Sequence, residues 1–302
     1  MIPACKLCPR RCGVPRGDTG AGACKSGETA RVARAALHFW EEPPISGSRG
    51  SGAVFFTGCP LGCAFCQNYE ISAGENQGRA FSPQALSELF FSLVEQGAHN
   101  INLVTPTHFL PQVRQALLVK KLAVPVVYNT SGYERPESLK TLEGLVDIYL
   151  PDYKYAQPDL AAALSRAPDY PETALAAIAE MVRQTGAPQY DGEGMMTRGV
   201  LIRHLILPGH TKNSMAALRA IAGRFPGIPV SLMAQYTPWG LAAREGGVPG
   251  YPELSRPITK RELQKVQEEL FSLGLEGFVQ SRKAKGESFI PDFHQFGTQP
   301  QG

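Results

Sequence analysis

One stretch of this sequence reads Thr57-Gly58-Cys59-Pro60-Leu61-Gly62-Cys63-Ala64-Phe65-Cys66-Gln67-Asn68. A cubane iron–sulfur cluster has four irons and is usually held by four thiolates. The C-x3-C-x2-C spacing supplies only three thiolates, and it therefore predicts a cluster with one iron left open for a substrate. Glycine and proline suit such a tight loop, because glycine adopts backbone angles that other residues avoid. A zinc site that lacks one ligand is the alternative interpretation of the same three cysteines.

The other four of the seven cysteines lie near the N-terminus with C-x2-C-x3-C-x11-C spacing: Cys5, Cys8, Cys12 and Cys24. Four thiolates suit either structural zinc or a second iron–sulfur cluster. Both metals stay open at this point. A closed set of four ligands indicates a structural or electron-relay role rather than catalysis.

Composition and length limit the class of protein. The chain has 302 residues, of which 43% are hydrophobic, and this is typical of an ordinary globular protein with one large domain. A net charge of +3 is too mild to indicate nucleic acid as a partner. We expect no membrane partner and a cytoplasmic location, because no apolar run is long enough for a membrane span and the N-terminus lacks the apolar core of a signal peptide. Cysteines usually stay reduced in that compartment.

Strand and helix patterns alternate after a turn-rich linker at residues 41–52. We expect strands at 53–56, 101–104, 124–128, 146–150, 200–207 and 229–234, with helices between them. Strands that alternate with helices indicate parallel pairing through right-handed crossovers. The predicted fold is therefore α/β, a partial (β/α)6 barrel with an N-terminal Cys-rich metal-binding extension. We divide it into an extension with linker at 1–52, a barrel at 53–240, and a C-terminal part at 241–302, with a helix at 259–273, an edge strand at 277–280 and a tail.

In a parallel barrel, functional residues gather where the strands end. Polar residues occupy most of the predicted strand ends: Thr105 to His108, Asn129 to Tyr133, Asp152 to Lys154, Arg203 with His204, and Gln235 with Tyr236.

Several of these residues have two interpretations. Neighbouring strand residues point to opposite faces, so we assign Arg203 to the interior and His204 to packing against a helix. His108 is the candidate catalytic residue, with a hydrogen-bonding scaffold as the alternative. Gln235 and Tyr236 either line the substrate mouth or are simply solvated. Glu41 and Glu42 are either surface charges or an acidic wall that closes the bottom of the barrel.

With these residues placed, the sequence resembles the radical S-adenosylmethionine (SAM) superfamily. Within it, the chain is similar to homologues of pyruvate formate-lyase activating enzyme, in the branch often called PflX-like. The resemblance covers nearly the whole chain and rests on residues 5–14, 40–43, 55–68, 102–108, 127–133, 147–154, 203–205 and 231–236.

The resemblance implies a function and two cofactors. The open iron of a [4Fe–4S] cluster on Cys59, Cys63 and Cys66 would chelate SAM. An electron would cleave SAM into methionine and a 5′-deoxyadenosyl radical, which abstracts hydrogen from a peptide or protein substrate. The narrower form of this function is a glycyl-radical enzyme activase. The implied electron donor is a reducing partner such as flavodoxin or ferredoxin.

The resemblance also assigns SAM contacts. Asp152 and Lys154 match an Asp-x-Lys pair near the methionine part of SAM, Arg203 matches an arginine on the fifth strand, and Phe65 matches an aromatic residue against adenine. Thr105, Thr107, Asn129 and Ser131 occupy strand ends that face the cofactor in the family.

Two positions depart from the activases. The activases have Gly-Gly-Glu-Pro where this chain has Thr105-Pro106-Thr107-His108, and they have an aspartate at the position of Asn129. Both changes remove negative charge, so backbone carbonyls and threonine hydroxyls would have to accept the bonds from SAM.

Two further classes of function stay open. One is radical SAM modification of a small metabolite or of a peptide, unrelated to glycyl radicals. The other is a protein without enzymatic activity, either an electron carrier or an iron–sulfur or zinc scaffold. Asp152, Lys154 and Arg203 favour an enzyme, because a carrier has no need for SAM contacts on separate strand ends.

Overall fold

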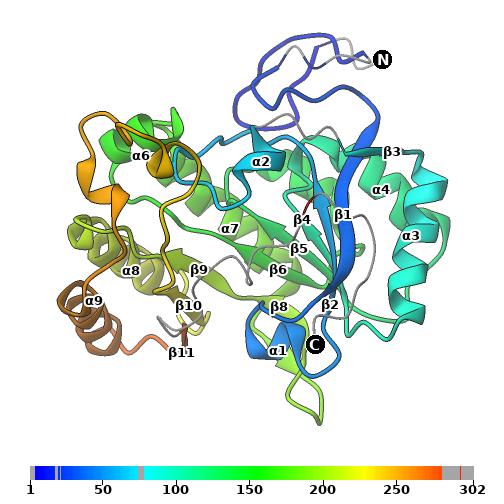
Figure 1. The fold of residues 1–302 in the computed structure, drawn as a ribbon. Coiled ribbons are helices and arrows are strands. Elements are labelled where there is room, and N and C mark those ends of the chain that lie inside the picture. The colour runs from blue at the N-terminus through cyan, green and yellow to red at the C-terminus, as the bar shows by residue number, and fades with distance from the viewer. Residues whose placement is uncertain (1–3, 18–19, 21, 74–77, 281–292, 294–302) are drawn as a thin grey trace.

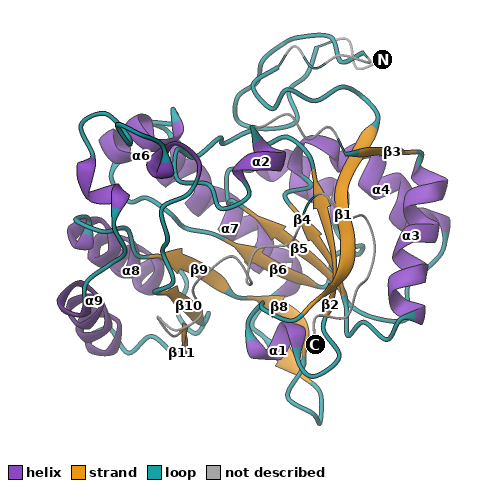
Figure 2. Ribbon diagram, in the orientation of Figure 1, coloured by secondary structure: helices purple, strands orange, loops and turns teal. Residues whose placement is uncertain are grey.

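The computed structural model describes residues 4–17, 20, 22–73, 78–280 and 293. Its centre is a mostly parallel sheet with helices packed against it (Figure 1, Figure 2). The parallel strands of the first sheet are β2 (Ser51–Phe56), β4 (Ile101–Val104), β5 (Val126–Thr130), β6 (Ile148–Pro151) and β8 (Met196–Val200). The α/β class expected from the sequence is therefore confirmed.

A second, three-stranded sheet continues the parallel arrangement. It contains β9 (Ile202–Leu205), β10 (Val230–Met233) and β11 (Gly277–Gln280) in the order β11-β10-β9. A parallel bridge between Asp152 and Arg203 joins the end of β6 to β9. The expected strand at 200–207 is thus divided, because the chain leaves one sheet after Val200 and enters the other at Ile202. The number of strands in the predicted barrel stays a prediction.

Antiparallel strands extend the edges of the first sheet. β1 (Ala30–His38) pairs with β2 and β3 (Arg79–Phe81) pairs with β1, while β7 (Gln189–Tyr190) pairs with β8 at the other edge. The sequence did not predict β1, because alanine and arginine are weak indicators of a strand. β1 pairs with β2 across the predicted boundary at residue 52, and the division into domains stays a prediction.

Helices lie between the strands along the chain, as the alternating pattern predicts, and they cover the sheets. The longer ones are α3 (Pro83–Glu95), α4 (Leu110–Val119), α6 (Pro158–Ser165), α7 (Tyr170–Thr185), α8 (Thr211–Arg224) and α9 (Lys260–Ser272). Ser82 caps α3, and Thr259 with Glu262 forms a capping box at the start of α9. Three short helices complete the set: α1 (Pro43–Ser46), α2 (Tyr69–Ser72) and α5 (Pro136–Leu139). No helix in the described part of the chain is long and apolar enough to cross a membrane.

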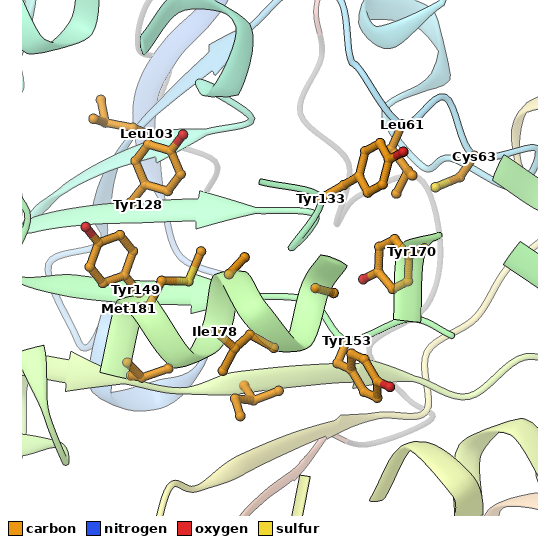
Figure 3. Close-up of a cluster of buried hydrophobic side chains, with 14 of the residues drawn as sticks. Leu61, Cys63, Leu103, Tyr128, Tyr133, Tyr149, Tyr153, Tyr170, Ile178 and Met181 are labelled. Carbon is orange, nitrogen blue, oxygen red and sulfur yellow. The ribbon is translucent and has the colours of Figure 1, made fainter. Parts of the chain in front are cut away.

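The core contains large aromatic side chains that pack against the inner face of α7 (Figure 3). Tyr128 and Tyr149 pack edge to face at 5.8 Å, near Ile178 and Met181 of the helix. A second group, Tyr133, Tyr153 and Tyr170, lies close to the cysteine loop, and rings stack on both sides of Tyr170. Burial of these rings fixes the helix against the strand ends, and so it positions the site described below.

Candidate active site

A cavity of about 710 Å³ opens at the ends of the parallel strands. Its walls contain residues from β2 and its following loop, from β4, β5, β9, β10 and β11, and from the segment that follows β6. The predicted site residues among them are Cys59, Cys63, Phe65, Cys66, Thr105, Asn129, Ser131, Asp152, Lys154 and Arg203. The fold therefore brings residues from far apart in the sequence to one cavity.

Backbone hydrogen bonds join the loop after β2 to two other segments of the chain. Ala64 N–H donates to the carbonyl of Leu164 at 2.8 Å, and the carbonyl of Ala64 accepts from Leu241 N–H at 2.8 Å. Gly58 has a φ of 79°, and a Cβ there would lie 2.5 Å from the carbonyl oxygen of Cys24. Glycine is therefore required at Gly58 by both backbone conformation and close approach.

The three cysteines of this loop suit an iron–sulfur cluster by their donor chemistry. Leu61 N–H lies 3.4 Å from Cys59 Sγ and the Ser72 hydroxyl lies 3.3 Å from Cys66 Sγ, so both sulfurs have hydrogen-bond donors. Burial raises the pKa of Cys59 to about 12 and that of Cys66 to about 11. Binding of metal would thus release protons from these thiols. Among the described residues, no three or more His, Cys, Asp or Glu side chains are gathered as a group that could hold a metal ion.

Asp152 is the centre of a buried charged network. Its Oδ2 accepts from Lys154 Nζ at 2.5 Å and its Oδ1 accepts from Arg203 Nε at 3.0 Å. Burial alone would raise the pKa of Asp152, but the charges of Lys154 and Arg203 outweigh it and hold that pKa below its usual value. Burial likewise opposes the charge on Lys154, yet Asp152 holds the pKa of Lys154 above its usual value. All three groups are therefore charged at neutral pH.

Each of the three side-chain nitrogens of Arg203 donates to a protein acceptor. Besides Asp152, it donates through Nη1 to Glu41 Oε2 at 3.2 Å and through Nη2 to the side-chain oxygen of Asn129. Glu41 Oε1 accepts in addition from the amides of Asn102 at 3.0 Å and Asn129 at 3.1 Å. The guanidinium thus cross-links β5, β6, β9 and the loop after β1. Its role in the structure is to position Asp152 and Asn129.

Lys154 makes fewer side-chain hydrogen bonds to the protein than Arg203 does. An ammonium has three donors, and the described residues give the side chain of Lys154 one hydrogen bond, to Asp152. The remaining donors belong to a side chain on the cavity wall. Lys154 can therefore meet an anionic group in the cavity.

Thr105 and Ser131 line the cavity beside this network. Thr105 has a φ of 58°, a conformation that favours glycine. Ser131 Oγ is buried and has no hydrogen-bond partner within the described residues. A buried hydroxyl without a partner is costly, so Ser131 fits a site that a polar ligand completes.

Phe65 lies at the cavity wall, where its ring packs at 6.4 Å from Tyr155 and at 6.0 Å from Tyr236. Tyr170 fixes the neighbouring strand ends from α7. Its hydroxyl lies 2.8 Å from the carbonyls of Ser131 and Asp152, and it accepts from Lys154 N–H at 2.9 Å. Tyr170 was missed at the sequence level, because it comes from a helix and only the fold brings it to the strand ends.

Thr107 and His108 lie behind the cavity and are absent from its walls. They belong to a 3-10 turn, Thr107–Phe109, in which both side chains are buried. Thr107 Oγ1 donates to Glu134 Oε1, and His108 Nε2 donates to the carbonyl of Thr57 at 2.6 Å. Burial lowers the pKa of His108 to about 3, so the ring is neutral. The geometry favours the scaffold interpretation of His108.

Glu134 is a buried carboxyl group that the sequence did not indicate. It is fully buried, and its Oε1 also accepts from Thr130 Oγ1 at 2.6 Å and from the Tyr128 hydroxyl at 3.4 Å. Burial raises the pKa of Glu134 to about 7, although these three hydroxyl donors oppose the shift. A single glutamate after a strand end has no local pattern that could reveal such burial.

The loop between β1 and α1 turns Glu41 and Glu42 inward. Glu41 lines the cavity, and Glu42 is only 1% exposed. Burial raises the pKa of Glu42. Both side chains point inward, and the surface-charge interpretation of the pair is therefore wrong. The sequence alone did not show that this loop turns inward. His204, in contrast, does not line the cavity: it is fully buried, and its Nδ1 donates to the carbonyl of Tyr153 at 2.7 Å. Its packing against a helix stays a prediction.

The N-terminal cysteines lie in a loop segment that folds back on itself. Cys5 N–H donates to the carbonyl of Val14 at 2.9 Å, and Gly13 N–H donates to the carbonyl of Cys5 at 3.0 Å. Ala23 N–H lies 3.4 Å from Cys12 Sγ, which brings Cys24 beside Cys12. Burial raises the pKa of Cys8 to about 12, with a further contribution from Cys24 and Cys12. These contacts place Cys8, Cys12 and Cys24 near one another, but the described residues form no group that could hold a metal ion, and metal binding there stays a prediction.

Comparison with known proteins defines the class of this site. Residues 53–221, more than half of the chain, match the model of the radical SAM superfamily. The protein belongs to that superfamily, and membership implies a [4Fe–4S] cluster and SAM as cofactors. The three thiols on one cavity wall and the unpartnered Ser131 hydroxyl are consistent with both.

Two individual proteins are similar to the chain. An uncharacterized protein of Methanocaldococcus jannaschii, MJ0674, is 28% identical over 273 residues, which cover 87% of this chain and 73% of that protein. A crystal structure of a domain of pyruvate-formate lyase-activating enzyme from Bacteroides vulgatus matches 58% of this chain and 91% of that domain, with 13% identity and a TM-score of 0.39.

Proposed function

We propose that this protein is a radical SAM oxidoreductase that abstracts hydrogen from a peptide or protein substrate. The narrower proposal is a glycyl-radical enzyme activase of the PflX-like branch. The observation that carries the proposal is the cavity itself, which has three cysteine thiols and the Asp152–Lys154 pair on its walls. Its volume of about 710 Å³ is in the usual range for sites that bind small molecules.

Cys59, Cys63 and Cys66 would hold the [4Fe–4S] cluster through their sulfurs. When bound, the cluster and SAM supply the one-electron chemistry that the superfamily uses. The chain's own residues bind and orient the cofactor. Lys154 offers ammonium donors to an anionic group, Asp152 fixes the position of that ammonium, and Arg203 fixes Asp152.

The remaining polar contacts belong to the ends of β4 and β5. Ser131 offers a hydroxyl, and Thr105 and Asn129 line the same wall. The side-chain oxygen of Asn129 already accepts from Arg203 and its amide donates to Glu41. Its role in the proposal is therefore to hold Arg203. Phe65 provides an aromatic face for the adenine ring. In these assignments, neutral groups take the place of the carboxylate that the activases have in Gly-Gly-Glu-Pro.

The test is SAM cleavage by anaerobically reconstituted protein with a strong chemical reductant. We expect 5′-deoxyadenosine from the parent protein and none from the triple variant Cys59→Ala, Cys63→Ala, Cys66→Ala. The double variant Cys5→Ala, Cys12→Ala serves as the matched control, because it removes two thiols outside the cavity. Formation of 5′-deoxyadenosine by the triple variant would refute the assignment of the cluster ligands.

Metal analysis of the same triple variant isolates the N-terminal cysteines. We propose that Cys5, Cys8, Cys12 and Cys24 hold one metal site. About one equivalent of zinc would define it as structural, whereas iron with sulfide would define a second cluster. Loss of that metal from the protein with Cys8→Ala and Cys24→Ala checks the ligand set. A triple variant with neither metal would overturn the proposed site.

A further inference from the structure

Arg10 joins the N-terminal extension (residues 4–29) to the cysteine loop after β2. Its Nε donates to the carbonyl of Pro60 at 2.9 Å, and its Nη2 donates to the carbonyl of Leu61 at 3.2 Å. Nη2 also donates to the carbonyl of Ser165 at 2.7 Å, at the end of α6, and Nη1 donates to the next carbonyl along the chain. One guanidinium thus holds the carbonyl oxygens of two segments that are distant in the sequence.

The barrel also contacts Arg10 through an aromatic ring. The guanidinium lies over the ring of Tyr133, 5.3 Å from its centroid, and Tyr133 is itself buried and donates through its hydroxyl to Asp169. Arg10 is half-buried, whereas the neighbouring Arg11 is exposed. A planar guanidinium has five donors in a fixed arrangement, so it can hold several acceptors at once. These contacts keep Arg10 in one orientation against the loop.

The first of these loop carbonyls shares a peptide group with an amide that faces a cysteine. The carbonyl of Pro60 and the N–H of Leu61 belong to one planar trans peptide group, in which the two point in opposite directions. Arg10 binds the carbonyl side, and on the other side Leu61 N–H lies 3.4 Å from Cys59 Sγ. Arg10 therefore fixes the direction in which this N–H points.

The next peptide group of the loop repeats this arrangement. It contains the carbonyl of Leu61, which accepts from Arg10, and the N–H of Gly62. Burial raises the pKa of Cys59 to about 12, and hydrogen bonding from the N–H groups of Gly62 and Leu61 opposes that rise. Both amides therefore stabilise negative charge on the Cys59 sulfur, and Arg10 binds the carbonyl of each peptide group.

A cation on the carbonyl side of a peptide group strengthens the hydrogen bond that its N–H donates. Hydrogen bonds in series polarise one another, and those with a charged partner are the stronger ones. Hydrogen bonds to the sulfurs are among the factors that set the reduction potential of an iron–sulfur cluster. Because the reduced cluster carries one more negative charge than the oxidised cluster, stronger N–H···S bonds favour the reduced form.

We propose that Arg10 is a positioning residue that raises the reduction potential of the cluster, by orienting and polarising the loop amides that face Cys59. The inference rests on the proposed function, because it assumes a cluster on Cys59, Cys63 and Cys66. Arg10 does not line the cavity, so its effect passes through the backbone of the loop. The N-terminal extension thus acts on the cluster from outside the cavity.

The experiment is a potentiometric titration of the reconstituted full-length protein, followed through the paramagnetic signal of the reduced cluster. Arg10→Gln removes both the charge and the donors, and Arg10→Lys keeps the charge but loses the planar fork. The charge control is Arg166→Gln. The Arg166 guanidinium lies 3.3 Å from the position that a Cβ on Gly62 would occupy, yet it donates no side-chain hydrogen bond to the loop among the described residues.

At a fixed potential, we expect the ratio of reduced to oxidised cluster to be about tenfold lower in Arg10→Gln than in the parent, which corresponds to about 59 mV for a one-electron couple. Arg10→Lys should also have a lower potential than the parent, because an ammonium cannot hold the same carbonyls in a planar fork. Arg166→Gln should keep the parent potential. The parent potential in either Arg10 variant, or equal shifts in Arg10→Gln and Arg166→Gln, would overturn the proposal.

Hydrogen–deuterium exchange of the metal-free proteins tests the orientation of the amides without the cluster. Peptides that cover residues 59–66 should exchange faster in Arg10→Gln than in the parent and in Arg166→Gln. Unchanged exchange in this loop would show that Arg10 does not position its amides, and it would overturn the proposal even if Arg10→Gln binds no cluster.

The parent protein separates this inference from the proposed function. If the parent holds no cluster that can be reduced, or if the triple variant of Cys59, Cys63 and Cys66 still holds it, the proposed function fails. If the parent cluster is lost in that triple variant and Arg10→Gln has the parent potential, the role of Arg10 alone fails.

Discussion

The cavity and the N-terminal extension use their charges in opposite ways. In the cavity, Arg203 is paired with Asp152 and Glu41 and is almost excluded from solvent. In the extension, Arg11 and Lys25 are exposed and sit in strained turns. The difference shows that buried charges here fix geometry, because each satisfies another, whereas exposed charges remain available to a partner. Breaking the network in the cavity should therefore lower the free energy of unfolding strongly, whereas changing the exposed charges of the extension should lower it little.

The largest expected effect comes from Arg203→Ala. It leaves Glu41 without its only cationic partner among the described residues and Asp152 with Lys154 alone, and breaking a buried pair in this way typically costs about 3–5 kcal/mol. Denaturant unfolding measures the loss. The control is Arg219→Ala, whose 2.6 Å pair with Glu269 is exposed on the arginine side and is expected to contribute about 1 kcal/mol or less. Similar losses of unfolding free energy in both variants would contradict the contrast between buried and exposed charges.

A second effect concerns pH. Burial raises the pKa of Glu134 to about 7, above its unfolded value near 4.5. The folded state then binds more protons than the unfolded state between these values, so the stability contribution is complete below pH 4.5 and is lost as pH rises through 7. The loss amounts to about 3 kcal/mol. Denaturant unfolding between pH 5 and pH 8 should show this slope in the parent and a flatter one in Glu134→Gln, and equal slopes would refute the raised pKa.

A smaller effect is expected from Thr107→Val. The hydroxyl donates to Glu134 and is not on the cavity wall. Loss of one buried hydrogen bond costs about 1 kcal/mol of stability. SAM affinity should stay at the parent value, and Thr105→Val provides the comparison from the cavity wall. Weaker SAM binding in Thr107→Val than in Thr105→Val would show that Thr107 belongs to the SAM site.

Much of this architecture could be predicted from the sequence, and particular residues show where prediction stopped. The parallel strands were recognisable as short apolar runs, and this placed Asp152, Lys154 and Arg203 at strand ends that meet in one cavity. Thr107 and His108 were expected there for the same reason. The 3-10 turn that follows β4 directs them into the core instead, and sequence spacing does not determine that rotation.

Residues outside the strand ends were harder to anticipate. Glu41 reaches the cavity from a loop before β2, and Tyr170 reaches the strand ends from α7. Neither has a local sequence signal, because only the tertiary fold brings these segments to the cavity and the strand ends. β1 was missed because its alanines and arginines do not resemble a typical strand.

The central claim is that Asp152 and Lys154 form the polar part of a SAM site beside the cysteine loop. Titration of SAM into the reduced protein, followed through the paramagnetic spectrum of the cluster, tests it most directly. Asp152→Ala should bind SAM about ten- to a hundredfold more weakly while its iron content stays at the parent value. Without Asp152 the Lys154 ammonium is no longer held in place, and the charge-assisted contact that it offers is typically worth about 1.5–3 kcal/mol. Parent-like SAM affinity in Asp152→Ala, with the cluster intact, would contradict the account.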